Sequence, residues 1–130
     1  MPSRKPTILI VDDEPGVART IALVVQHSGY AALAAFSGRQ ALALSETVVA
    51  DLAIVDVNMP DLDGVRTAVQ MCKLLPRCKI LLISGDTEAT AILENAKADG
   101  IEFPVLAKPV PPEQLLATVD SLLHQSRPQN

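Results

Sequence analysis

Four short apolar runs in this chain each end on polar residues that can bind a metal ion or a phosphate. The runs and the polar residues after them are 8–11 with Asp12 and Asp13, 52–55 with Asp56, 80–83 with Ser84, and 105–107 with Lys108. Short apolar runs bounded by turn residues, with helical patterns between them, are typical of buried parallel strands. In an open α/β sheet, ligands bind beyond the carboxyl ends of the strands, so we expect the polar side chains to meet in one crevice.

The pattern as a whole predicts five strands that alternate with five helices in a doubly wound α/β sandwich with right-handed crossovers. The predicted strands are residues 7–11, 30–36, 51–55, 79–83 and 104–107, and the predicted helices are 16–28, 38–48, one that follows the loop 58–64 and ends before Pro76, 87–98 and 112–125. Pro15 suits the first turn of its helix, Gly29 ends that helix, and Ser37 can cap the next one. The alanine-rich strand 30–36 is predicted to lie at an edge of the sheet.

The 130 residues, 48% of them hydrophobic, predict a single domain with its core at about residues 7–125 and a flexible tail at 126–130. A domain of this size buries about 68% of the surface of its unfolded chain, which is enough for a real core. With only three aromatic residues, that core must be aliphatic, which suits a sheet covered on both faces. The net charge of −4 argues against a nucleic-acid-binding surface.

Neither membrane insertion nor zinc binding fits the sequence. No apolar stretch approaches the roughly 20 residues that a membrane span needs, and residues 1–6 lack the apolar core of a signal peptide. Cys72 and Cys78 do not have the spacing of a zinc site, and no histidine lies near them in the sequence. We interpret them as reduced thiols of a cytosolic protein, with a disulfide as the alternative.

Three carboxylates are expected to share the crevice. Asp12 and Asp13 alone would suit a turn or helix cap, because Asp-Asp before Glu-Pro is good helix-start chemistry. Asp56 favours a different interpretation. Its strand and the strand of residues 8–11 should be neighbours, which places the three carboxylates close together. Two like charges about 4 Å apart cost about 4 kcal/mol at an effective dielectric of about 20, so a compensating cation is expected. Mg²⁺ is the natural candidate, because it is commonly held by one or two carboxylates plus a phosphate.

Ser84 and Lys108 add a hydroxyl donor and an ammonium to this crevice. Preorganised donors and cations stabilise the charge that develops on a transferring phosphoryl group. Taken singly, a strand-terminal serine and a solvated lysine would be the simpler interpretations. Their joint placement at strand ends favours phosphate chemistry.

Four segments resemble the receiver (response regulator) domain of two-component signalling. They are Val-Asp-Asp-Glu at 11–14, Val-Asp-Val-Asn-Met-Pro-Asp-Leu-Asp-Gly at 55–64, Ile-Ser-Gly at 83–85 and Ala-Lys-Pro at 107–109. The segments follow the family's order and spacing, and the resemblance covers about residues 7–125. It implies a flavodoxin-like three-layer sandwich with strand order 2-1-3-4-5.

The resemblance also implies a role for each site residue. Asp56 would accept a phosphoryl group from a phosphohistidine on a sensor histidine kinase or phosphotransfer protein. Asp12, Asp13, Asp56 and the backbone carbonyl of Asn58 would hold Mg²⁺. Ser84 would be the switch hydroxyl and Lys108 would pair with the phosphoryl group.

Further consequences of the resemblance concern the state and partners of the domain. It implies a cis peptide bond before Pro109, a close approach of the phosphoryl group at Gly85, and control of the phosphorylated state's lifetime by Asn58 and Asp86. The domain would catalyse only its own phosphorylation and dephosphorylation. It would act in the cytoplasm on a protein effector or on an output domain outside this chain. It would bind neither nucleic acid nor a membrane. A second version of this hypothesis has the domain form a homodimer on activation.

One position departs from the family pattern. Receivers usually carry Phe or Tyr three residues before the lysine, where this chain has Val105. Either Phe103 substitutes from a shifted register, or the output surface signals without an aromatic rotamer change.

Two alternative functions remain. An aspartate-nucleophile phosphatase would want a second acid two residues after Asp56, where this chain has Asn58. A pseudo-receiver, a protein-interaction module that is never phosphorylated, usually loses an acidic residue or the lysine, and none is lost here.

Overall fold

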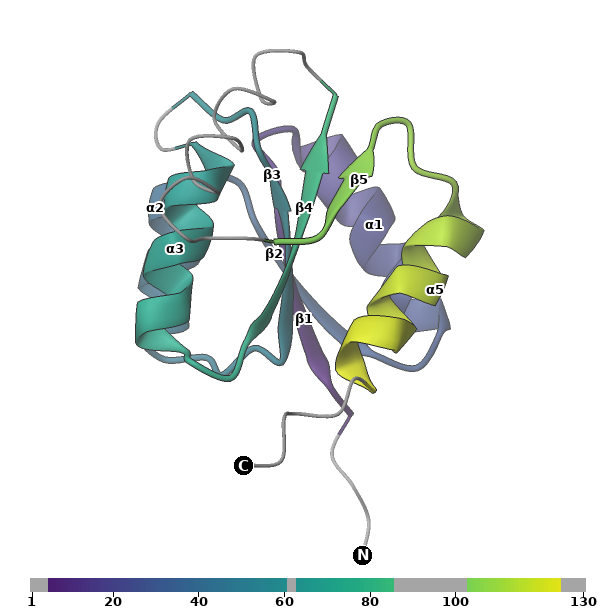
Figure 1. Ribbon diagram of the computed structural model, residues 1–130, viewed down its shortest axis with the longest axis horizontal. Coiled ribbons are helices and arrows are strands. Elements are labelled where there is room, and N and C mark those ends of the chain that lie inside the picture. Colours follow the sequence, from purple (N-terminus) through teal and green to yellow (C-terminus); the bar gives the residue numbers. More distant parts are fainter. Residues whose placement is uncertain (1–4, 61–62, 86–102, 125–130) are drawn as a thin grey trace, which may run out of the picture.

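One parallel sheet with helices on both faces forms a three-layer α/β sandwich (Figure 1). The structure, a computed structural model, describes residues 5–60, 63–85 and 103–124. The strands are β1 (Thr7–Val11), β2 (Ala31–Ala35), β3 (Leu52–Asp56), β4 (Lys79–Ser84) and β5 (Val105–Ala107). Their order is β2-β1-β3-β4-β5 and every pair is parallel, which confirms the predicted sheet and the edge position of β2.

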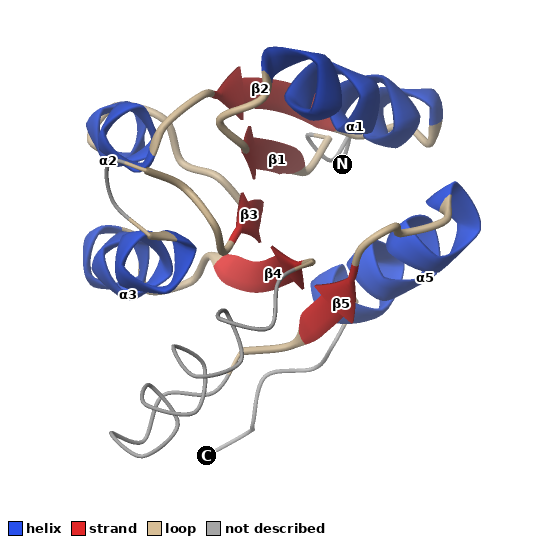
Figure 2. Cartoon of the chain, turned by 90° about the horizontal axis from the view of Figure 1, so that it is seen from above, coloured by secondary structure: helices blue, strands red, loops and turns tan. Residues whose placement is uncertain are grey.

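Four helices cover the sheet within the described residues. They are α1 (Pro15–His27), α2 (Gly38–Ser45), α3 (Gly64–Leu74) and α5 (Pro112–Leu123). Seen from above, α1 and α5 lie on one face of the sheet, and α2 and α3 on the other (Figure 2). The helix predicted at 87–98 lies outside the described residues. All described helices are too short or too polar to cross a membrane.

The predicted helix boundaries hold at three ends. Pro15 is the first residue of α1, and Gly29 follows that helix with a φ of 97°, a backbone conformation that glycine adopts without steric cost. The Ser37 side chain accepts a hydrogen bond from the Gln40 amide, as expected of an N-cap.

Several other boundaries differ from the prediction by one to three residues; for example, the last helix ends at Leu123 rather than at 125, and β5 begins at Val105 rather than at 104. The helix predicted to reach residue 48 ends at Ser45. The Glu46 and Thr47 amides bond to carbonyls three residues back, and the β-branched residues from Thr47 onward are poor helix formers. Tyr30, predicted within a strand, precedes β2 and packs against the core on the α1 and α5 side. Its hydroxyl donates a hydrogen bond to Asp120 Oδ1, which ties this turn to α5.

The alternation of side chains along the strands creates two aliphatic cores. Odd-numbered residues of β1, such as Leu9, pack with α2 and α3, whereas even-numbered ones, such as Ile8, pack with α1 and α5. Because β3 and β4 are covered on both faces, their apolar residues are almost entirely buried. This rigid centre holds the carboxyl ends of β1, β3 and β4 in fixed relation to one another.

Candidate functional site

The polar residues that follow the apolar runs meet at one edge of the sheet. Asp12 follows β1, Asp56 is the last residue of β3, and Ser84 is the last residue of β4. The register pairs Asp56 with Ile83 and Ser84 with Ala107, the residue before Lys108. The structure therefore brings together residues that are up to 96 positions apart, between Asp12 and Lys108.

Asp12, Asp13 and Asp56 form a carboxylate cluster. One oxygen from each side chain lies within 4.8 Å of the others. Asp12 is 2% exposed and Asp56 is 5% exposed, while Asp13 is partly open to solvent. The Lys108 Nζ lies 3.4 Å from Asp56 Oδ2 and 3.9 Å from Asp12 Oδ2. One ammonium thus pairs with two of the three carboxylates of the cluster, which leaves an excess of negative charge.

Local hydrogen bonds hold the two buried carboxylates. Asp12 Oδ1 accepts the Glu14 amide at 2.9 Å, and Asp56 Oδ1 accepts the Asn58 amide at 3.3 Å. The interpretation of Asp12 as a turn residue before a helix is therefore confirmed, since this oxygen closes the turn before α1. Its other oxygen faces Lys108, so the same side chain belongs to both the turn and the cluster.

Burial raises the pKa of both Asp12 and Asp56 above the ordinary value of 3.8. For Asp12, the Glu14 amide opposes this effect and the charge of Asp56 adds to it. For Asp56, the Lys108 ammonium is the largest opposing influence, followed by the Asn58 amide. Both ionised carboxylates are therefore held in the folded chain against an electrostatic cost.

This cost predicts a pH dependence for the metal-free protein. A carboxyl group with a raised pKa binds more protons in the folded than in the unfolded state, so it lowers stability as pH rises from 3.8 to the raised pKa. Asp12→Asn should therefore be more stable than wild type in a chelator, with an advantage that grows through this pH window. Urea unfolding of both proteins at a series of pH values measures the difference. An advantage that shrinks as pH rises would contradict the electrostatic account.

The donor set of the cluster fits a hard divalent cation. Carboxylate oxygens are the ligands that Mg²⁺ prefers, and a cation would offset the charge that Lys108 leaves uncompensated. Asn58 is exposed and its amide donates to Asp56 Oδ1, so this residue lies beside the cluster. The residues present are therefore compatible with a Mg²⁺ site.

Ser84 and Gly85 lie against the lysine on the β4 side. The Ser84 carbonyl accepts the Lys108 amide at 2.9 Å, and Ser84 is half-buried. A Cβ atom on Gly85 would lie 3.2 Å from Lys108 Cβ and Cδ, so this glycine leaves room for the lysine side chain. The Lys108-Pro109 bond is cis, as the resemblance implies. Asp86 lies outside the described residues.

Val105, which stands where receivers usually carry an aromatic residue, and Phe103, its suggested substitute, occupy different environments. Val105 on β5 is 40% exposed, whereas Phe103 is half-buried against the core on the α2 and α3 side. In this structure Phe103 therefore contributes to the core, and the position three residues before the lysine presents an aliphatic side chain.

Sequence reasoning missed two features of the site. Gly64, the first residue of α3, packs so tightly that a Cβ atom there would lie 2.1 Å from the backbone oxygen of Asp56. Nothing in a glycine at a helix start signals such a contact. A cavity of about 1140 Å³ also adjoins the cluster between α1 and the β5–α5 turn. It is lined by polar residues Asp13, Glu14, Thr20 and Lys108, and by apolar residues such as Val17, Ile21 and Leu115.

Comparison with known proteins gives a consistent result. Residues 8–120 match the family model described as the response regulator receiver domain. The chain is 30% identical over 127 residues to the transcriptional regulatory protein GlrR of Escherichia coli, covering 97% of this chain and 28% of GlrR. It is 34% identical over 121 residues to the sensor kinase CckA of Brucella abortus, covering 92% of this chain and 13% of CckA.

Solved structures agree with these matches. The chemotaxis protein CheY4 of Vibrio cholerae is 31% identical and superimposes with a TM-score of 0.79, covering 92% of this chain and 99% of CheY4. The curated relatives named above are much longer than the region matched, since this chain spans less than a third of either.

Proposed function

The chain belongs to the response regulator receiver domain family of two-component signalling, and from this premise we propose that Asp56 accepts a phosphoryl group from a phosphohistidine on a histidine kinase or phosphotransfer protein. The observation that carries the proposal is the position of Asp56, which is buried beside a second carboxylate and lies 3.4 Å from the Lys108 ammonium. A fold gathers such charges at a strand end where a charged group is to be bound.

The proposed reaction uses groups that the chain itself supplies. An oxygen of the Asp56 carboxylate attacks phosphorus, the P–N bond of the phosphohistidine breaks, and its electron pair remains on the imidazole nitrogen. Lys108, already within 4 Å of Asp56, is placed to pair with a phosphoryl oxygen of the acyl phosphate. Hydrolysis of the acyl phosphate by water would return Asp56 to the free carboxylate.

The metal site is part of the same proposal. Asp12, Asp13, Asp56 and the backbone carbonyl of Asn58 would hold Mg²⁺. When bound, Mg²⁺ offsets the negative charge that the carboxylates and the phosphoryl oxygens bring to one place. The support is the convergence of the three carboxylate oxygens within 4.8 Å and their charge excess over Lys108.

The cavity beside the cluster would admit the phosphoryl donor. It reaches the site at Asp13 and Lys108 and is otherwise lined largely by apolar side chains of α1 and α5. A partner with an apolar surface around its phosphohistidine could cover this cavity and exclude water. Docking there would bring the phosphorus close to Asp56.

Signal output would begin at Ser84. We propose that the acyl phosphate draws the Ser84 hydroxyl toward it and shifts the population of conformations of the surface that includes β5 and α5. Because Val105 is aliphatic and exposed, this chain would signal without an aromatic rotamer change. The recipient would be a protein effector or an output domain outside this chain, or a second copy on activation. The two free thiols support a cytoplasmic location.

Incubation of the wild-type chain with acetyl phosphate and Mg²⁺, followed by intact-mass measurement, tests the proposal. We expect a single phosphoryl adduct that is absent when a chelator replaces Mg²⁺. A pseudo-receiver would give no adduct under either condition, and a phosphatase would turn over unrelated phosphomonoesters many times. Either of these results would overturn the assignment.

A further inference from the structure

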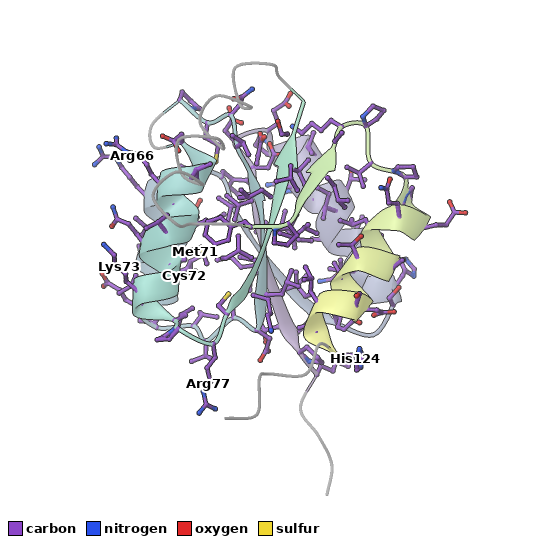
Figure 3. All side chains as sticks on the ribbon, viewed as in Figure 1. Arg66, Met71, Cys72, Lys73, Arg77 and His124 are labelled. Carbon is purple, nitrogen blue, oxygen red and sulfur yellow. The ribbon has the colours of Figure 1, made fainter. Side chains whose placement is uncertain are left out.

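The outer face of α3 carries a basic stripe. Arg66, Gln70 and Lys73 follow one another at helical spacing on the exposed side of α3, and Arg77 lies in the turn after the helix. Figure 3 shows Arg66 and Lys73 pointing away from the sheet, with Arg77 below the end of the helix. The stripe thus runs from the acidic edge of the sheet to the opposite edge.

This stripe stands out from the charge of the whole chain. Residues 64–79 contain four basic side chains and no acidic one, whereas the chain has a net charge of −4. Among the described residues, Arg66, Lys73 and Arg77 form no ion pair with a carboxylate. Within the part of the chain that the structure describes, no carboxylate offsets the positive charge of this face.

Two large apolar side chains are exposed at the C-terminal end of α3 and in the turn after α2. Leu74, next to Lys73 on α3, is 45% exposed, and Val49 in the turn after α2 is 65% exposed. The helices α2 and α3 pack side by side (Figure 2), and the turns after them lead into β3 and β4 at the edge opposite Asp56 (Figure 1). Leu74, which follows Lys73 directly in the chain, therefore adds exposed apolar surface to the basic stripe.

We propose that this face binds an acidic amphipathic protein helix, with its carboxylates on Arg66, Lys73 and Arg77 and an apolar side chain over Leu74. The charge complementarity and the adjacent apolar surface together select this partner. A lipid surface fits less well, because the apolar face of α3 is already buried in the core and cannot enter a bilayer. A nucleic acid would leave Leu74 and Val49 uncovered and would be repelled by the acidic remainder of the chain.

Titration of the ¹⁵N-labelled chain with a synthetic helical peptide tests this proposal. The peptide has about four turns, with Glu at successive i, i+4, i+7 and i+11 positions and Leu beside them. We expect amide shifts along α3, including Leu74, that weaken as salt is added. A peptide with Gln in place of Glu should bind at least about tenfold more weakly, a difference of about 1.4 kcal/mol.

Variants locate the binding face. Arg66→Glu combined with Lys73→Glu should lower the affinity of the chain for the acidic peptide by at least about tenfold. Lys5→Glu makes one of the same charge changes at an exposed lysine outside α3 and should leave the affinity within about twofold. Amide shifts outside α3 that match those of the wild-type chain show that the α3 variant is folded. If it is not folded, Arg66→Gln combined with Lys73→Gln replaces it.

Three results would overturn the proposal. The first is equal binding of the Glu and Gln peptides, or no binding by either. The second is amide shifts that map outside α3. The third is tighter binding of duplex DNA, or of vesicles that contain phosphatidylserine, with the same sensitivity to the α3 variants. Because Arg66, Lys73 and Arg77 are not part of the carboxylate cluster, a failure here would leave the phosphorylation proposal unaffected.

Discussion

Asp56→Asn should abolish the phosphoryl adduct that acetyl phosphate and Mg²⁺ form on the wild-type chain. The amide that replaces the carboxylate is a poor nucleophile, and its Oδ1 can still accept the Asn58 amide, so the backbone should stay in place. The expected effect is complete loss within the sensitivity of intact-mass measurement. The same variant should be more stable than wild type in a chelator, because it removes a buried charge from the cluster.

Asp63→Asn is the matched control for this experiment. Asp63 caps α3 by accepting the Arg66 amide at 2.9 Å, a role that asparagine also fills, and it is not part of the carboxylate cluster. It should be phosphorylated as wild type is. An adduct that persists on Asp56→Asn, or one that is lost on Asp63→Asn, would place the acceptor elsewhere.

Gly64→Ala should destabilise the chain by about 3 kcal/mol and slow its phosphorylation, the largest expected effect of any single methyl group here. The added Cβ would lie 2.1 Å from the Asp56 backbone oxygen and 2.7 Å from Val57 Cα. Both atoms belong to the backbone of the central strand and the residue after it, so neither can rotate aside. Relief would require α3 to move outward, which breaks the bond from the Gly64 amide to the Val57 carbonyl.

Gly16→Ala is the control that isolates this steric effect. Gly16 also lies in the first turn of a helix, but a Cβ atom there meets nothing within 4 Å. Its replacement should be neutral or stabilising by up to about 1 kcal/mol, because alanine is the better helix former. Urea unfolding of both variants measures the contrast. A Gly64→Ala variant as stable as Gly16→Ala would show that α3 does not press on Asp56 in this way.

The prediction of the sheet rested on side-chain periodicity, which is a local property. The runs at 8–11 and 52–55 are apolar at every position, and only a strand covered on both faces buries all of them. Where the local signal was weaker, the boundaries shifted, as at the end of α2 and before β2. Tyr30 left the predicted strand because its ring packs in the core and its hydroxyl bonds Asp120, a partner 90 positions away.

The candidate site could likewise be predicted in part from the sequence. That Asp12, Asp56, Ser84 and Lys108 share one edge of the sheet was predictable, because each follows a run that must be a strand and parallel strands end together. Their identities also favoured the kind of ligand that we propose, since carboxylates, a hydroxyl and an ammonium are groups that bind a hard cation and a phosphoryl oxygen.

Only the tertiary structure decided the contacts between side chains and their strength. The 3.4 Å approach of Lys108 to Asp56, the burial that raises two carboxyl pKa values, and the closeness of Gly64 to Asp56 all depend on how distant segments pack. The same holds for Phe103, which the packing assigned to the core, and for the basic face of α3, whose cations form no ion pair among the described residues. Periodicity records which face of an element is buried, whereas distances and solvation are set by neighbours that are remote in the sequence.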